Sequence, residues 1–243
     1  MLRCSAGDEL QVFDGEGSLY KYKITGIENK KVIIALLEQI SLNAESPLNL
    51  TLVQGILKGE KMDMVIQKAT ELGVKEIIPA VTERSQIRHT RKVDRWRKIA
   101  EEASRQSGRT MIPVVHEPME YRNALCVMRN EYKKFLTHYA LPITHHDLLN
   151  GFIFWEEGGL SLKEAIKQSA VSIQHSENSQ LSTLNSQLFV LIGPEGGFTK
   201  DEVELAVSKG LITVSLGKRI LVMAANWDIR IASIPPFWRG IRN

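Results

Sequence analysis

Residues 188–198 have the sequence LFVLIGPEGGF, which joins an apolar run to a glycine-rich turn. The apolar run, Leu188 to Ile192, is typical of a buried strand, and the glycines after it favour a tight turn. Thr199 then precedes Glu202 by three residues, the capping-box pattern of a helix N-terminus. The stretch therefore predicts a buried strand, a tight turn and a helix, in that order.

The glycine turn is open to two interpretations. Glycine lets the backbone adopt positive φ angles and lets a ligand approach main-chain N–H groups closely, which favours a binding loop. An ordinary connection between a strand and a helix explains the spacing equally well. The turn is not a nucleotide-binding fingerprint, because the chain lacks both G-x-G-x-x-G and a Gly-Lys-Ser/Thr that would complete a P-loop.

The rest of the chain divides into two regions. Strand-like patterns at residues 9–13, 20–26 and 31–37 predict a small all-β module, and Ser46-Pro47 is its expected exit linker. After that linker, strands are predicted at 50–57, 74–80, 135–138, 188–192 and 212–216, and helices at 60–72 and 92–106. This alternation predicts an α/β fold with a mostly parallel sheet and helices on both faces. The polar residues 171–187 are expected to form a surface loop.

Composition indicates a globular protein. Hydrophobic residues make up 43% of the 243 residues and charged residues 24%, and no apolar run is long enough to span a bilayer. The two cysteines, Cys4 and Cys126, have no spacing that suggests a zinc site or a disulfide framework. We therefore expect a reduced, cytoplasmic protein without a metal site or a membrane partner.

Positive charge is concentrated in one segment. Residues 84–109 contain nine Lys and Arg against three acidic residues, a local net charge of +6 in a chain whose formal net charge is +3. Such a face suits a polyanion, and nucleic acid is the favoured partner. A solvated helix face or a protein contact is the alternative interpretation.

Three pairs of segments resemble one family. They are 54–62 (QGILKGEKM) with 66–73 (IQKATELG), 83–85 (ERS) with 106–109 (QSGR), and 191–197 (LIGPEGG) with 216–221 (LGKRIL). Together they are similar to the RsmE family, SPOUT-class methyltransferases that methylate N3 of a uridine in the 16S ribosomal RNA of the small subunit. The resemblance covers residues 1–221.

The resemblance implies a PUA-like β-barrel over residues 1–46 and a trefoil-knotted methyltransferase domain over 48–243, in a homodimer that uses S-adenosyl-L-methionine. The small ribosomal subunit is the implied partner. The implied cofactor-binding residues are Leu191, Ile192, Gly193, Gly196, Gly197, Leu216, Gly217, Ile220 and Leu221. From the basic segment, Arg88, Arg91, Lys92 and Arg95 are expected to bind RNA.

The chemistry of the implied reaction indicates what side chains it needs. Uracil N3 must lose a proton while negative charge grows on the flanking carbonyl oxygens, so a nearby arginine would stabilise the transition state. Arg84 and Arg109 are the candidates, and contact with phosphate is an equally open role for both. Glu71 either orients one of these arginines or caps a helix. Glu195 is interpreted as an acceptor that stabilises the turn, and His138 as a core histidine or part of the cofactor pocket.

The two ends depart from the family pattern. The family's barrel begins upstream of the segment matched by residues 2–10, so the barrel is expected to be N-terminally truncated and open at one edge. From about residue 222 the family's polar turn and closing helix are missing, and Pro235-Pro236 forbids a continuous helix. A frameshifted 3′ end is our hypothesis for the tail. Two alternatives to the leading function follow: a catalytically inactive RNA-binding remnant, and a SPOUT methyltransferase acting on another RNA such as tRNA.

Overall fold

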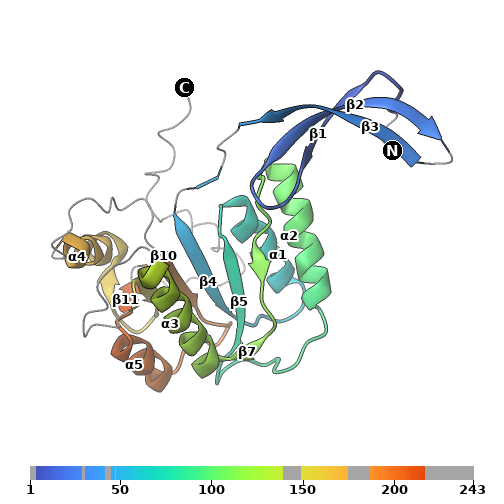
Figure 1. Cartoon of the computed structure of the whole chain (residues 1–243). Coiled ribbons are helices and arrows are strands. Elements are labelled where there is room, and N and C mark those ends of the chain that lie inside the picture. Colours follow the sequence, from blue (N-terminus) through green and yellow to red (C-terminus); the bar gives the residue numbers. More distant parts are fainter. Residues whose placement is uncertain are drawn as a thin grey trace.

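The fold is that of a computed structural model, which describes residues 4–28, 31–41, 45–46, 48–138, 149–174 and 187–216 (Figure 1). The first described segment forms a three-stranded antiparallel sheet in the order β1-β2-β3. Its strands are β1 (Glu9–Phe13), β2 (Leu19–Glu28) and β3 (Lys31–Ile40). All three predicted strands are confirmed. Within the described residues β1 and β3 each pair on one side only, and the side chains of β3 are largely exposed.

The remaining strands form one sheet in the order β6-β5-β4-β10-β8-β11-β9, with β7 pairing β5 as well. Every strand pair in it is parallel. Its strands are β4 (Asn49–Gly55), β5 (Glu76–Val81), β6 (Val114–Val115), β7 (Met119–Glu120), β8 (Gly151–Phe154), β9 (Leu160–Ser161), β10 (Gln187–Ile192) and β11 (Ile212–Ser215). The parallel sheet predicted from the alternating pattern is confirmed.

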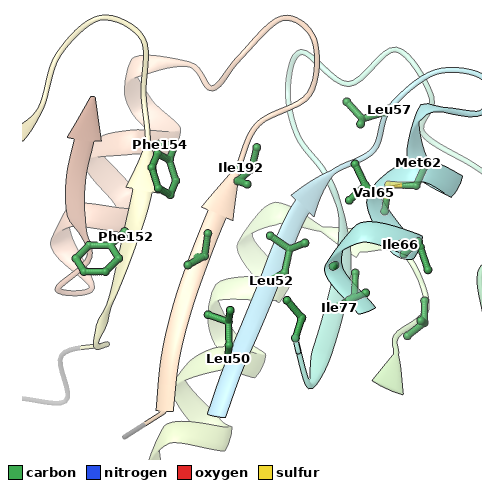
Figure 2. Packing of buried hydrophobic residues seen from close by; sticks show 14 of the residues in the cluster. Leu50, Leu52, Leu57, Met62, Val65, Ile66, Ile77, Phe152, Phe154 and Ile192 are labelled. Carbon is green, nitrogen blue, oxygen red and sulfur yellow. The ribbon is translucent and has the colours of Figure 1, made fainter. Parts of the chain in front are cut away.

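Helices cover both faces of this sheet. They are α1 (Lys61–Glu71), α2 (Val93–Ser107), α3 (Tyr121–His138), α4 (Leu162–Gln174) and α5 (Lys200–Ser208). Buried side chains of α1, α2 and α4 pack with Leu50, Leu52 and Val190 on one face. Figure 2 shows Met62, Val65 and Ile66 of α1 beside Leu50 and Leu52. Those of α3 and α5 pack with Val53 and Leu191 on the other. The central strands alternate between two apolar cores, which explains their nearly continuous hydrophobicity.

The structure contradicts one expectation from the sequence, and two others lie partly or wholly outside the described residues. The segment 135–138 is the end of α3, so the predicted strand there is wrong. Within the predicted loop 171–187, α4 extends to Gln174 and β10 begins at Gln187, while 175–186 lie outside the described residues. The unusual tail and the segment that would close a knot also lie outside them, from residue 217 onward. None of the described helices is long and apolar enough to cross a membrane.

Candidate active site

The glycine turn lies at the carboxyl edge of the parallel sheet. Ile192, the last residue of β10, is in register with Gln54 of β4 and with Phe154 of β8 (Figure 2). The turn therefore emerges between the ends of two neighbouring strands. In open parallel sheets this edge is where ligands bind. Thr199 and Glu202 then form the predicted capping box, which starts α5 directly after the turn.

Close packing against the end of β4 fixes the position of the turn. A Cβ atom on Gly55 would lie 2.5 Å from the ring Cδ and the N atom of Pro194, so only glycine fits there. The buried side chain of Gln54 donates from Nε2 to the carbonyl oxygens of Gly55, at 2.9 Å, and Gly193, at 3.2 Å. The main chain of the turn is thus held in one place by its neighbours.

Glu195 ties the turn to the segment that follows β4. Its Oε1 accepts hydrogen bonds from the backbone N–H of Lys58 and from Lys61 Nζ, both at 3.1 Å. Burial raises the pKa of Glu195, but backbone N–H donors and the Lys61 ammonium outweigh burial and hold the pKa below its usual value. The carboxylate is therefore an ionised acceptor that stabilises the turn, as we interpreted it from the sequence.

Because the pKa of Glu195 is lower in the folded chain than in the unfolded chain, its contribution to stability is present above the unfolded pKa of about 4.3 and is lost as the pH falls through the folded pKa. Glu195→Gln is expected to lower the free energy of unfolding by about 1 kcal/mol or less at pH 7. Urea unfolding at pH 7 and at acid pH measures this difference, which should shrink in acid. Glu204→Gln, at an exposed site of α5, is the control; an equal loss there would contradict the assignment.

Arg84 lies against the same turn. Its Nη1 donates to the carbonyl oxygen of Gly196 at 2.9 Å, and a Cβ on Gly196 would lie 3.1 Å from the Arg84 Cβ. The segment carrying Arg84 is fixed because Thr82 N–H donates to Ser85 Oγ at 3.0 Å and Glu83 N–H donates to Glu202 Oε1 at 2.8 Å. The structure therefore brings Arg84 and the glycine turn together, and the arginine remains exposed.

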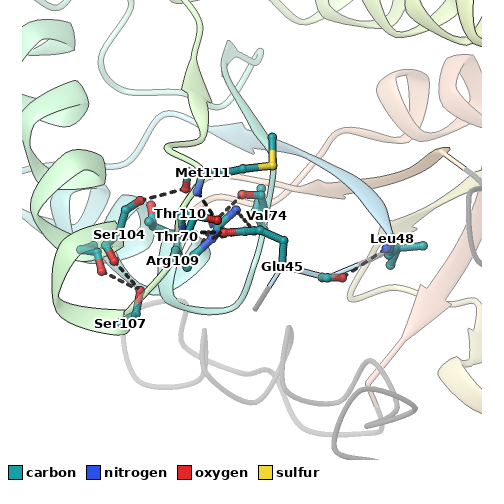
Figure 3. Close-up of polar contacts among 11 residues, drawn as sticks. Glu45, Leu48, Thr70, Val74, Ser104, Ser107, Arg109, Thr110 and Met111 are labelled. Carbon is teal, nitrogen blue, oxygen red and sulfur yellow. Dashed lines mark hydrogen bonds and ion pairs between the residues drawn. The ribbon is translucent and has the colours of Figure 1, made fainter. Parts of the chain in front are cut away.

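Arg109 lies elsewhere, at the junction between the two sheets (Figure 3). Its side chain is only 6% exposed, and its guanidinium makes an ion pair with Glu45 at 2.9 Å. It also donates from Nη1 to the carbonyl oxygens of Thr70, at 2.8 Å, and Val74, at 2.9 Å. Because its donors are directed into the protein, this position argues against the catalytic and phosphate-binding roles considered for Arg109.

The candidate RNA-binding side chains differ in their exposure and in how many of their donors are already bonded within the protein. Arg95 donates from Nε to Asp63 at 2.8 Å, yet its side chain stays 60% exposed. Lys92 Nζ donates to the carbonyl oxygen of Gly59 at 3.1 Å, and Arg88 makes a long contact of 3.4 Å with the carbonyl oxygen of Glu83. Arg91 is exposed and has no ion pair with any residue that the structure describes. The predicted helix carrying part of this basic segment is confirmed as α2.

A cavity of about 500 Å³ opens beside the Arg84 segment, between the end of β5 and the starts of α3 and α5. Its lining includes Glu83, Arg88 and Tyr121. The Tyr121 hydroxyl donates to the carbonyl oxygen of Glu202 at 3.0 Å. Burial, followed by the negative charge of Glu202, raises the pKa of Tyr121 well above its usual range, so this hydroxyl stays protonated.

Comparison with known proteins identifies the family. The RNA methyltransferase domain family matches residues 44–224, and the RNA methyltransferase PUA domain family matches residues 2–37. A protein of Synechocystis sp. named ribosomal RNA small subunit methyltransferase E is 31% identical over 235 residues, which cover 96% of this chain and 68% of that protein. The chain belongs to the ribosomal RNA small subunit methyltransferase E family. A Buchnera aphidicola member is 32% identical over 226 residues, 91% of this chain and 76% of its own.

Two solved structures of similar proteins share the fold of this methyltransferase. The Neisseria gonorrhoeae member, crystallised with S-adenosyl methionine, is 29% identical and superposes with a TM-score of 0.73 over 95% of this chain and 83% of its own. The Legionella pneumophila putative methyltransferase Lpg2936, also in complex with S-adenosyl methionine, is 26% identical, with a TM-score of 0.70 over 95% of this chain and 83% of its own.

The structure describes some of the other candidate site residues of this methyltransferase. Leu191 and Ile192 are fully buried in β10, which leaves backbone groups to face a ligand, and Leu216 is partly buried against the core. Gly217, Ile220 and Leu221 lie outside the described residues, and so does the His138 side chain. Glu71 accepts from Gln67 and Lys68 rather than from an arginine.

Sequence reasoning missed Glu156, which follows β8 and whose carboxylate contacts Gly197. The only signal for it was an acidic residue directly after a short apolar segment, FIFW, and that signal is too weak to single it out. Among the described residues no group of three or more His, Cys, Asp and Glu could hold a metal ion.

Proposed function

We propose that this chain transfers the methyl group of S-adenosyl-L-methionine to N3 of a uridine in the 16S ribosomal RNA of the small subunit. The observation that carries the proposal is the fixed glycine turn at the carboxyl edge of the sheet, with Arg84 bonded to its Gly196 carbonyl oxygen at 2.9 Å. Family membership and two relatives crystallised with S-adenosyl methionine support it.

The residues present fit this cofactor. Gly55 and Gly193 bring main chain close together at the turn, and a Cβ on Gly193 would lie 3.0 Å from the carbonyl carbon of Gly197. Such a turn offers backbone N–H and C=O groups that an adenine edge can use, as the family resemblance implied. The cofactor supplies an activated methyl group, so the protein needs to position the two reactants more than to provide a strong nucleophile.

Arg84 is the residue that we assign to the reacting base. One N–H of its guanidinium is fixed on Gly196, and this bond orients the group beside the turn. Its other N–H groups belong to an exposed side chain and can donate to a uracil carbonyl oxygen as charge grows there, which lowers the barrier to loss of the N3 proton. Arg109 instead holds the junction between the two regions.

Arg84→Ala is expected to lower turnover by about 100-fold, because removal of one donor to a developing oxyanion typically costs this much. Arg91→Ala is the matched control from the same basic segment; it should raise the KM for RNA and leave turnover unchanged. Steady-state methyl transfer, with S-adenosyl-L-methionine affinity measured separately, distinguishes the two. If Arg84→Ala changed only the KM for RNA, Arg84 would be a phosphate contact and the assignment would be wrong.

The proposal extends to the domains, the assembly and the partner of the chain. We assign residues 1–46 to a PUA-like RNA-binding domain and 48–243 to a knotted methyltransferase domain that forms a homodimer. Arg88, Arg91, Lys92 and Arg95 supply the positive surface for phosphate groups. The small ribosomal subunit, in the cytoplasm, is the proposed partner.

Methyl transfer from radiolabelled S-adenosyl-L-methionine tests the substrate. Small subunits with unmethylated RNA should become labelled, and the product should be 3-methyluridine at one position. Labelling of tRNA in place of the small subunit would show another RNA target. RNA binding without labelling would show the inactive remnant that the unusual tail suggested.

A further inference from the structure

Glu156 follows β8, whose two neighbours in the sheet are β10, which leads into the glycine turn, and β11. Phe154, at the end of β8, is in register with Ile192 of β10 on one side and Val214 of β11 on the other. Trp155 continues this pairing, since its N–H donates to the carbonyl oxygen of Val214 at 3.0 Å. Glu156 therefore stands at the carboxyl edge, with the glycine turn after β10 beside it and the end of β11 on its other side.

The carboxylate of Glu156 packs directly on the glycine turn. A Cβ on Gly197 would overlap Oε1 and would lie 2.8 Å from Cδ and 2.9 Å from Oε2 of Glu156. Gly197 also has a φ angle of +70°, which favours glycine for a second reason. Only a residue without a side chain lets this carboxylate reach the main chain of the turn.

The carboxylate has acceptor capacity to spare. Glu156 is exposed and makes no hydrogen bond or ion pair with any other residue that the structure describes. An ionised carboxylate can accept bonds at both oxygens and can hold two neighbouring hydroxyl groups at once. Glu195, the other carboxylate at the turn, is already bonded to Lys58 and Lys61 and lacks this freedom.

The positions of the glycine turn and of Glu156 match a common arrangement by which parallel sheets bind a nucleoside. In doubly wound sheets a glycine turn follows one strand, and an acidic residue after the adjacent strand accepts hydrogen bonds from ribose hydroxyls. Here the turn follows β10 and Glu156 follows β8, its parallel neighbour. We infer that Glu156 binds the 2′- and 3′-hydroxyls of the cofactor ribose. This inference rests on the proposed function, because it needs the glycine turn to be the cofactor site.

Calorimetric titration with three ligands tests the inference on the whole chain. S-Adenosylmethionine, S-adenosylhomocysteine and 5′-methylthioadenosine share the ribose; only the first carries a sulfonium charge, and only the first two carry an amino-acid group. Glu156→Ala should weaken all three by a similar factor, roughly 10-fold to 100-fold, and Glu156→Gln by less. Glu157→Gln, which removes the same charge at the exposed neighbouring residue, should leave all three affinities unchanged.

Three results would overturn the inference. A loss confined to S-adenosylmethionine would place the carboxylate at the sulfonium. A loss for the first two ligands but not for 5′-methylthioadenosine would place it at the amino group. Equal affinities in Glu156→Ala and the unchanged chain would remove it from the site. If the unchanged chain bound none of the three ligands, the proposed function would fail, and this inference with it.

Discussion

Arg109→Ala is expected to lower the free energy of unfolding by about 3–5 kcal/mol, the usual cost of removing one partner of a buried ion pair. The Glu45 side chain is 12% exposed and would lose the guanidinium that balances its carboxylate. The carbonyl oxygens of Thr70 and Val74 would each lose a donor as well. Urea unfolding at pH 7 measures the change.

Arg109→Ala should weaken above all the contact between the N-terminal three-stranded sheet and the region of the parallel sheet. Glu45 also accepts hydrogen bonds from the backbone N–H groups of Thr110 and Met111, both at 3.0 Å (Figure 3). The adjoining main chain bonds the β1–β2 turn, since Gly17 N–H donates to the Thr110 carbonyl oxygen at 3.2 Å and Ile112 N–H donates to the Gly15 carbonyl oxygen at 3.0 Å. The ion pair between Arg109 and Glu45 therefore fixes the main chain at Glu45 and supports this contact between the two regions.

Two further variants make the interpretation testable. Arg105→Ala removes an exposed arginine from the last turn of α2, the helix that precedes Arg109, and should cost less than about 0.5 kcal/mol. Glu45→Gln, added to Arg109→Ala, should recover part of the loss because it removes the unpaired buried charge. A loss for Arg109→Ala no larger than that of Arg105→Ala would contradict the structural role.

Gly55→Ala is expected to reduce methyl transfer by about 100-fold, because the added methyl group must displace the glycine turn and a shift of about 1 Å in an active site can cost this much. The new Cβ would lie 2.5 Å from the backbone N of Pro194 and 2.8 Å from the carbonyl carbon of Gly193. These are main-chain atoms that no rotamer change can move away. The overpacking should also lower the free energy of unfolding by about 1–3 kcal/mol.

Gly158→Ala is the matched control for this variant. A Cβ at Gly158 meets no heavy atom within 4 Å, and the residue does not have a positive φ. It should therefore leave both methyl transfer and stability unchanged. Equal activity of Gly55→Ala and Gly158→Ala would show that the position of the turn does not matter for the reaction.

The sheet was predictable from sequence where the strands are long and buried. The runs that became β4, β5 and β10 are apolar because they face two cores, and their boundaries agree with the prediction to within a few residues. The strand predicted at 135–138 failed because a run of four residues, of which only Phe135 and Leu136 are apolar, does not distinguish a strand from a helix. The buried residues Ala124, Leu125 and Met128 have helical spacing and belong to the same helix, α3, which begins upstream at Tyr121.

The site was only partly predictable. The glycine turn and the capping box are local patterns, and sequence alone is enough to find them. The partner of Arg109 lies 64 residues away in the chain, so nothing local indicated that its donors were already used. Glu156 follows β8, a strand of four residues, and its contact with Gly197 exists only because two distant segments pair in parallel.

Calorimetric titration of S-adenosyl-L-methionine into the purified chain tests the central claim most directly, namely that the glycine turn at the carboxyl edge is a cofactor site. Saturable binding of one molecule per chain, weakened in Gly55→Ala and unchanged in Gly158→Ala, is the result that the structure predicts. Absence of binding to the folded chain, or binding that is equally strong in Gly55→Ala, would contradict it.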